Sequence, residues 1–365
     1  MKSNVLLLGP GPCNPSQKVM ESLSEPTLGH MDSEFINLVE ETKTNLRSVF
    51  RTQNRVTFPI SGTGSAGMEF LLVNFIEPGD KIVVAVNGVF GGRVANLAKR
   101  MGAEVIEVVQ DWGRAMDNEA FIDVIKREEP KITAIVNAET STGVYQSMEG
   151  IGEAVHEVGG LLMIDCVTSL AGMPVEIDRW GVDMAFSGTQ KCLSVPPGLS
   201  PVTLSERAIE VFKSRKSPVP SFYLDLEQLL MYVDGSGGRS YHHTPPVNMI
   251  YGLHASLIEI LDEGLEARWQ RHATAAAYLI EEMTPFGFTP FVPEAERLNP
   301  LTTLSFPEGF KDAEMRQKIR SDHNIEVGAG LGPMAGKIWR IGLMGNNAAP
   351  SSVDQLVEAL KKTLS

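Results

Sequence analysis

The strongest chemical signal in the chain is a lysine that follows small and hydroxyl residues. Lys191 ends the run Ser-Gly-Thr-Gln-Lys, residues 187–191. A turn of this kind can hold an amine out of bulk water, where its pKa falls and it can attack an aldehyde to form a Schiff base. On this segment alone, an exposed surface lysine is an equally good interpretation.

The second signal is an aspartate at the end of an apolar run. Asp165 closes the sequence Leu-Leu-Met-Ile-Asp, residues 161–165, and burying a carboxylate is costly unless it has a partner. The ring nitrogen of pyridoxal phosphate would be such a partner, because it works as an electron sink only when an acid keeps it protonated. A helix N-cap or a core ion pair would also explain Asp165. A metal site is less favoured, because no histidine clusters with this residue.

A third segment, residues 61–69, carries glycines and hydroxyls into a helix-prone stretch. Backbone N–H groups and the helix dipole at such a junction can bind a phosphate. An ordinary loop–helix junction explains the pattern equally well. The segment contains neither a Walker sequence nor a GxGxxG motif, which disfavours a nucleotide ligand.

Single residues elsewhere could bind a flat ring or a carboxylate. Phe90 lies in a glycine-flanked loop, where it could stack on a ring or simply anchor the loop. Arg340 is a charge inside an apolar run, where it could grip a substrate carboxylate or form a structural salt bridge. No second basic residue is obvious, which favours small substrates with uncharged side chains. His242 and His243 look metal-like, but adjacent histidines rarely share one face, so no metal site is expected.

The elements that must position these residues alternate along the first two thirds of the chain. Short apolar runs at residues 81–86, 132–136 and 161–165 predict strands covered on both faces. Helix-prone stretches at residues 118–128 and 151–158 lie between them. This alternation predicts an α/β domain with a largely parallel sheet, in which ligands bind beyond the carboxyl ends of the strands.

The length of 365 residues suggests about two domains. From residue 249 the pattern changes to a long helix at 251–283, strands at 301–306 and 338–343, and a closing helix at 353–364. We therefore predict an N-terminal extension (1–15), a large domain (16–262) and a smaller α+β domain (263–365).

The composition limits the class of protein. A net charge of −13 argues against a broad nucleic-acid or acidic-membrane surface. The three cysteines include no CxxC pair, which disfavours a disulfide framework or a zinc site. The apolar run at residues 5–8 is too short for a signal peptide core or a membrane span, so a cytoplasmic protein is expected.

Taken together, the ordered motifs resemble the class V aminotransferases, in particular the alanine–glyoxylate/serine–pyruvate aminotransferase group. The segments that carry the resemblance extend over nearly the whole chain: residues 6–12, 61–64, 139–143, 165–169, 188–191, 241–244 and 336–342. The resemblance implies a fold-type I pyridoxal 5'-phosphate transferase, with a mostly parallel sheet in its large domain. It also implies a homodimeric transaminase that moves the amino group of alanine or serine to glyoxylate or pyruvate.

The same resemblance assigns roles to individual residues. Lys191 would hold the cofactor covalently and shuttle the substrate proton, Asp165 would pair with the ring nitrogen, and Arg340 would bind the substrate carboxylate. The other cofactor contacts that it implies are Phe90 and Val167 at the ring, Thr140 at the ring hydroxyl, Thr63, Gly64, Ser65 and Gln190 at the phosphate, and Tyr241 and Thr244 from a partner subunit. Relatives often carry a larger aromatic residue in place of Phe90. Residues 241–244 follow a turn-rich segment, 234–238, and would cross a two-fold interface.

Three alternative functions can be weighed against this one. Similar enzymes that act on ureidoglycine carry a polar amide in place of Tyr241, which argues against that substrate. A cysteine desulfurase-like lyase needs a nucleophilic cysteine on a late loop, but the last cysteine is Cys192. A non-enzymatic binding protein would be expected to lose Lys191 or Asp165. The sequence selects neither the amino donor nor the role of His30, which we expect near the substrate entrance.

Overall fold

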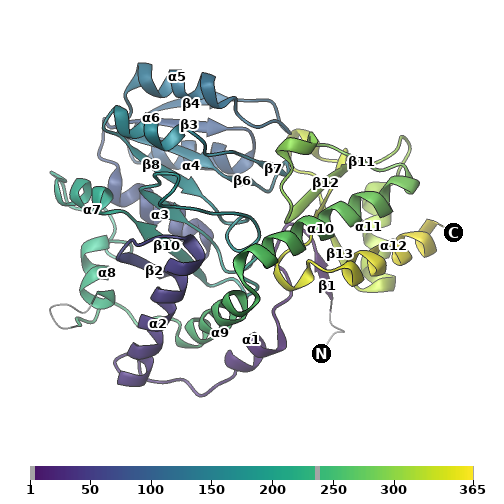
Figure 1. Ribbon diagram of the computed structural model, residues 1–365, viewed down its shortest axis with the longest axis horizontal. Helices are drawn as coiled ribbons and strands as arrows, with labels where there is room; N and C mark the ends of the chain where they lie inside the picture. Colours follow the sequence, from purple (N-terminus) through teal and green to yellow (C-terminus); the bar gives the residue numbers. More distant parts are fainter. Residues whose placement is uncertain (1–4, 235–238, 365) are drawn as a thin grey trace.

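A seven-stranded sheet forms the centre of the larger of two lobes (Figure 1) in the computed structural model, which describes residues 5–234 and 239–364. The strand order is β2-β10-β9-β8-β5-β3-β4, and β10 is the one strand of these seven that runs antiparallel to its neighbours. The strands are β2 (Val56–Ser61), β3 (Lys81–Val86), β4 (Glu104–Val109), β5 (Ile132–Val136), β8 (Leu161–Asp165), β9 (Met184–Phe186) and β10 (Leu199–Leu204). The three predicted strands coincide with β3, β5 and β8, and the largely parallel sheet is confirmed.

Helices cover both faces of this sheet, which explains the continuous apolar runs. Within β8, Leu162 and Ile164 pack into one core with helices of one face, while Leu161 and Met163 pack into a second core on the other face. The first core takes its helical side chains from α2 (Ser33–Phe50), α5 (Asn118–Glu128), α6 (Ile151–Glu157) and α9 (Val247–Glu263). The second takes them from α3 (Gly64–Phe75), α4 (Val89–Arg100), α7 (Glu206–Lys213) and α8 (Leu226–Val233).

The ends of these helices follow from local chemistry. Helix α5, predicted at residues 118–128 and observed there, begins at an N-cap aspartate, Asp117, whose side chain accepts from the backbone N–H groups of Glu119 and Ala120. It ends at Glu129, which adopts a left-handed conformation with φ of 45°. Helix α6 is one residue shorter than predicted.

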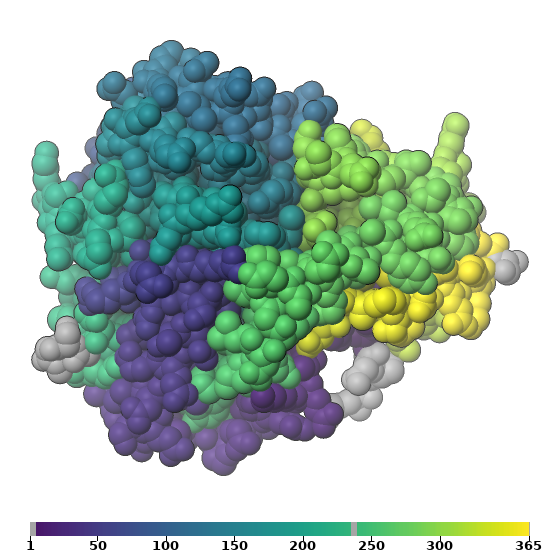
Figure 2. Space-filling view, in the orientation of Figure 1, coloured from purple at the N-terminus to yellow at the C-terminus, as the bar shows by residue number. Residues whose placement is uncertain are grey.

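The smaller lobe, coloured green to yellow in Figure 2, contains a five-stranded sheet in the order β1-β13-β14-β12-β11. Its first strand comes from the N-terminal end of the chain and pairs in parallel with β13. The strands are β1 (Leu6–Leu8), β11 (Thr289–Pro290), β12 (Leu301–Ser305), β13 (Ile325–Ala329) and β14 (Ile338–Gly342), and the helices are α10 (Leu265–Met283), α11 (Asp312–His323) and α12 (Pro350–Leu364). The strands predicted at 301–306 and 338–343 and the closing helix are present, with ends that differ by one to three residues. The domain boundary at 262 stays a prediction.

The long helix predicted at residues 251–283 was wrong as a single element. It is two helices, α9 and α10, separated at Gly264. This residue has φ of 83° and ψ of 137°, a conformation that glycine adopts readily and that ends the helical hydrogen-bond pattern.

The remaining elements are short, and no helix among the described residues is both long and apolar enough to cross a membrane. They are α1 (Gln17–Ser22), the hairpin of β6 (Ala138–Glu139) and β7 (Val144–Tyr145), and four 3-10 turns at Thr284–Phe286, Glu294–Glu296, Gly332–Met334 and Gly345–Asn347. In the predicted turn-rich segment 234–238, residues 235–238 lie outside the described part of the chain.

Candidate active site

A cavity of about 130 Å³ lies at the carboxyl ends of the parallel strands, where such sheets bind ligands. It brings together eight of the residues predicted for the cofactor: Gly64, Ser65, Phe90, Thr140, Asp165, Val167, Gln190 and Lys191. Thr63 directly precedes the cavity as the N-cap of α3. Arg340, Tyr241 and Thr244 do not line it.

The side chain of Lys191 is buried at one end of this cavity. Burial lowers the pKa of Lys191 to about 8, so its amine loses its proton far more readily than an exposed lysine does. The Nζ atom donates a hydrogen bond to the backbone oxygen of Pro10. Gly11 has φ of 103°, and a Cβ atom there would come within 2.6 Å of the Lys191 side chain. Residues 10 and 11 therefore form a close-fitting wall beside the amine.

The carboxylate of Asp165 lies in the same cavity, at the end of β8. Burial raises the pKa of Asp165 to about 7. Its Oδ1 atom accepts a 2.9 Å hydrogen bond from the backbone N–H of Val167, and no other hydrogen bond to this carboxylate occurs in the described part of the chain. A buried carboxylate with one oxygen uncommitted suits a cationic partner placed in the cavity.

The N-terminus of α3 supplies the anion-binding end of the cavity. Thr63 caps this helix by position, but no side chain accepts a hydrogen bond from its first N–H groups. The side-chain oxygen of Gln190 is buried there with no hydrogen-bond partner among the described residues. Because the two ends of an amide exchange by a simple flip, this group can also donate to an anion. Free N–H groups, a helix dipole and an unpaired amide together suit a phosphate.

The position of Phe90 depends on a residue that the sequence argument did not single out. Phe90 lies in the first turn of α4, and its backbone N–H donates a 2.9 Å hydrogen bond to Glu139 Oε2. The other carboxylate oxygen accepts from the backbone N–H of Ser141 at 3.0 Å and from its hydroxyl at 2.6 Å. Glu139 is fully buried, and burial raises its pKa. The available signal was a glutamate three residues after an apolar strand, β5.

The structure corrects one expectation about basic residues. Arg93 lines the cavity, and its guanidinium lies 4.9 Å from the centre of the Phe90 ring. From the sequence, Arg340 was the one basic residue predicted to bind a substrate carboxylate. Arg93 follows Phe90 by three positions on α4, so helical periodicity could have identified it.

Arg340 reaches toward the cavity from β14 of the smaller lobe. Its Nε atom donates to the backbone oxygen of Ala329 at 2.6 Å, and its Nη1 atom donates to that of Thr140 at 3.2 Å. Burial lowers the pKa of Arg340 to about 10, so the side chain remains charged near neutral pH. Arg340 forms no ion pair within the described ranges, which leaves its charge available to a bound carboxylate.

Tyr241 and Thr244 are exposed and lie away from the cavity of their own chain. The Tyr241 ring lies 5.3 Å from that of His30. Between them, His243 Nε2 is 2.7 Å from Ser61 Oγ, and the Nδ1 atoms of His242 and His243 are 2.7 Å apart. No group of three or more His, Cys, Asp or Glu residues suited to a metal occurs in residues 5–234 and 239–364.

Comparisons with known proteins agree on one family. The family described as aminotransferase class-V matches residues 16–349. The chain is 39% identical over 362 residues to an alanine–glyoxylate aminotransferase of Callithrix jacchus, covering 98% of this chain and 87% of that protein. It is 35% identical over 376 residues to an (S)-ureidoglycine–glyoxylate transaminase of Bacillus subtilis (strain 168), covering 98% and 90%. The crystal structure of an alanine–glyoxylate aminotransferase from Nostoc sp. superposes with a TM-score of 0.98 at 43% identity, covering 100% of this chain and 96% of that one.

Proposed function

Because the chain belongs to the class-V aminotransferase family, we propose that it uses pyridoxal 5'-phosphate to move the amino group of alanine or serine to glyoxylate or pyruvate. The chain is an aminotransferase with the fold-type I architecture that its sequence predicts. One observation carries the cofactor assignment: a single cavity holds the amine of Lys191, the carboxylate of Asp165 and the uncapped N-terminus of α3.

The residues of the cavity fit this cofactor in each of its parts. Gly64, Ser65 and Gln190, with Thr63 beside them, would hold the phosphate at the end of α3. Phe90 and Val167 would pack against the ring, and Thr140 would lie near its hydroxyl group. When bound, the cofactor supplies an aldehyde for amines and a protonated ring that withdraws electrons from the substrate. Asp165 would keep the ring nitrogen protonated, because a carboxylate buried beside it favours the cationic form.

Lys191 would act first as the covalent anchor and then as the proton carrier. When its Nζ atom is free, Lys191 would be the base that takes the proton from the substrate Cα and the acid that gives it back. A pKa of about 8 makes the free amine available near neutral pH. Arg340 would hold the substrate carboxylate and so orient Cα toward Nζ.

Alanine as donor and glyoxylate as acceptor are supported by the names of the relatives, whereas serine and pyruvate follow from the sequence resemblance. Several proteins 37–39% identical to this chain are alanine–glyoxylate aminotransferases. Ureidoglycine is the second candidate donor, since a transaminase for it is 35% identical. Tyr241, where such enzymes carry a polar amide, favours alanine or serine. A desulfurase-like activity is disfavoured, because Cys13, Cys166 and Cys192 are all buried.

We also propose that two copies of the chain form each active site. Tyr241 and Thr244 are exposed, and large apolar side chains are exposed near them in the fold, including Phe222 at 72% and Tyr223 at 46%. Both rings pack beside His242, which follows Tyr241 directly. A two-fold interface would cover these groups and bring the hydroxyls of residues 241 and 244 to the neighbouring cavity. Three buried free thiols suit the reducing cytoplasm, which we propose as the location.

The experiment that tests the proposed function is a half-reaction screen. The purified, cofactor-loaded protein is mixed with single amino acids, and the loss of the visible cofactor band is followed. Alanine or serine should convert the cofactor fastest, and glyoxylate or pyruvate should restore the band. Conversion by ureidoglycine at a much higher rate than by alanine would select the second candidate instead.

A further inference from the structure

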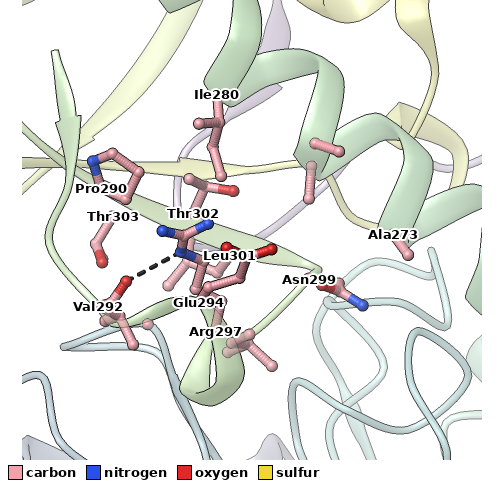
Figure 3. Close-up of a pocket in the computed structure, with 14 residues that line it drawn as sticks. Ala273, Ile280, Pro290, Val292, Glu294, Arg297, Asn299, Leu301, Thr302 and Thr303 are labelled. Atoms are coloured by element: carbon pink, nitrogen blue, oxygen red, sulfur yellow. Dashed lines mark hydrogen bonds between the residues drawn. The ribbon is translucent and has the colours of Figure 1, made fainter. Parts of the chain in front are cut away.

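A second cavity lies in the smaller lobe, between α10, the segment after β11 and strand β12 (Figure 3). Its volume is about 260 Å³, and it shares no lining residue with the active-site cavity. Pockets for drug-sized ligands span roughly 300–1,000 Å³, so this one suits a smaller organic molecule.

The cavity contains an arginine whose charge has no counter-ion. Arg297 is half-buried, and its Nε atom donates a 3.0 Å hydrogen bond to the backbone oxygen of Val292. Figure 3 shows this bond and the guanidinium group among the residues that line the cavity. The Arg297 side chain forms no ion pair and no other hydrogen bond in the described part of the chain. The fixed Nε atom leaves the two terminal nitrogens as a fork that matches a carboxylate.

An unpaired carboxylate lines the same cavity. Glu294 precedes Arg297 by three residues, yet it forms no ion pair with Arg297 or with any other described residue. The opposite wall is apolar and comes from α10 and β12: Ala273, Ala276, Ala277, Ile280 and Leu301. The cavity therefore combines a cation and an anion that do not pair with each other and an apolar surface.

We propose that this cavity binds a free α-amino acid with an aliphatic side chain such as that of leucine. Arg297 would hold its carboxylate, Glu294 its ammonium group, and the α10 wall its side chain. A 2-oxo acid lacks the ammonium group and a simple amine lacks the carboxylate, so each would lose one of the two polar contacts.

The proposed site is close to the active site but separate from it. Thr303 of β12 lies opposite Arg340 of β14 in the sheet. The hydroxyl of Thr303 donates a 2.9 Å hydrogen bond to the backbone oxygen of Thr142, and Leu298 N–H donates one of 2.9 Å to Gly143. Both cavities thus adjoin the segment of residues 140–143, while their charged groups differ. Binding in the second cavity should not need Arg340.

The test is calorimetric titration of the full-length, cofactor-loaded protein with α-methyl-L-leucine, which has no Cα hydrogen and cannot be transaminated. The titration is done in an Arg340→Gln background, which silences the substrate carboxylate site. We expect one saturable binding event per chain. Arg297→Gln should weaken it at least about tenfold, as the loss of a charge-assisted pair does. Arg320→Gln is the matched control, because Arg320 is a half-buried arginine of the same lobe outside the cavity.

A second variant tests the site without replacing Arg297, whose loss could affect folding. Ala277 is exposed at the mouth of the cavity, so Ala277→Leu should block binding while leaving the thermal midpoint within the range of the control. Glu294→Gln should weaken α-methyl-L-leucine but not 4-methyl-2-oxopentanoate. The proposal is overturned if Arg297→Gln binds like the control, if binding is absent when Arg340 is replaced but present with Arg340 intact, or if the oxo acid binds as tightly as the amino acid.

Discussion

The guanidinium of Arg340 donates a 3.2 Å hydrogen bond to the backbone oxygen of Thr140, across the boundary between the two lobes. Thr140 lines the active-site cavity, whereas Arg340 belongs to β14 of the smaller sheet. The bond therefore holds the proposed substrate-binding charge at a fixed place beside the cofactor cavity. A second bond, from Nε to Ala329, removes the remaining freedom of the side chain.

This arrangement predicts how the enzyme responds to the loss of Arg340. Arg340→Gln should raise KM for both the amino and the oxo acid by about tenfold or more, since a charge-assisted hydrogen bond contributes about 1.5–3 kcal/mol. Cofactor affinity, measured by the visible absorbance, should change little. Arg340→Lys, which keeps the charge, should be less impaired. An unchanged KM in Arg340→Gln would exclude this residue as the carboxylate site.

The attachment of the cofactor gives a direct chemical prediction. The purified protein should absorb visible light, and borohydride reduction should fix the cofactor on Lys191, because this amine lies in the cavity and burial lowers its pKa to about 8. Peptide mapping identifies the modified residue. Lys191→Ala, which still has the phosphate site, should bind the cofactor without a reducible bond. A label on any other lysine contradicts the assignment.

Asp165 should reduce the stability of the cofactor-free protein and support the activity of the cofactor-loaded protein. Its pKa is about 7 in the fold, above the usual value of an unfolded aspartate, so the folded chain holds more protons between about pH 4 and 7. The contribution of Asp165 to the free energy of unfolding should therefore fall as the pH rises through this range, whereas His272, whose pKa burial lowers to about 3, contributes in the opposite sense. Asp165→Asn should remove most of that fall and be more stable than wild type at pH 8. With cofactor bound, the same variant should lose most turnover, because an amide does not keep the ring nitrogen protonated. A stability difference between wild type and Asp165→Asn that is the same at pH 4 and pH 8 would contradict the first part, and near-normal turnover of the variant would contradict the second.

The sequence predicted three of the seven strands of the larger sheet, because these strands are covered on both sides. Continuous apolar runs of five or six residues distinguish such strands from amphipathic ones, and β3, β5 and β8 matched the prediction in full. Eight predicted cofactor residues line one cavity, since each follows a strand whose carboxyl end lies at the same edge.

What the sequence did not reveal depends on contacts between distant segments. Glu139 holds the start of α4, 49 positions earlier in the chain, and no local pattern encodes that contact. Arg93 is different, because it follows Phe90 by three positions on α4 and helical periodicity could have identified it. The helix predicted at 251–283 is divided at Gly264, whose positive φ separates α9 from α10.

The next prediction concerns the preferred amino donor, and a variant of Arg93 provides an additional test of it. Alanine or serine should react faster than aspartate or glutamate, because Arg340, which lies beside the cavity, is the one cation that we assign to a substrate carboxylate. Arg93 is occupied in a contact with the Phe90 ring. Steady-state kcat/KM values for the four donors test this. If aspartate or glutamate is far faster, and Arg93→Gln abolishes that preference, then Arg93 binds a second carboxylate and the proposed substrate class is wrong.

The final prediction is that Tyr241 and Thr244 act in the neighbouring subunit. Both are exposed in their own chain and absent from its cavity, so within one chain they have no role at the phosphate. Two defective chains, Lys191→Ala and a Tyr241→Phe/Thr244→Ala double variant, are refolded together, and the activity of the purified heterodimers is measured. If the sites are shared, one site of the heterodimer combines the intact Lys191 of one chain with the intact residues 241 and 244 of the other. Its second site carries both defects.

Each homodimer should be poorly active, and purified heterodimers should recover activity approaching half that of wild type. If residues 241 and 244 served their own cavity, every site in the heterodimer would keep one defect and nothing would be recovered. Light scattering provides the independent control, because the wild-type protein should be a dimer at every concentration at which it is active. A fully active monomer would contradict the shared site, even if mixing gave some recovery.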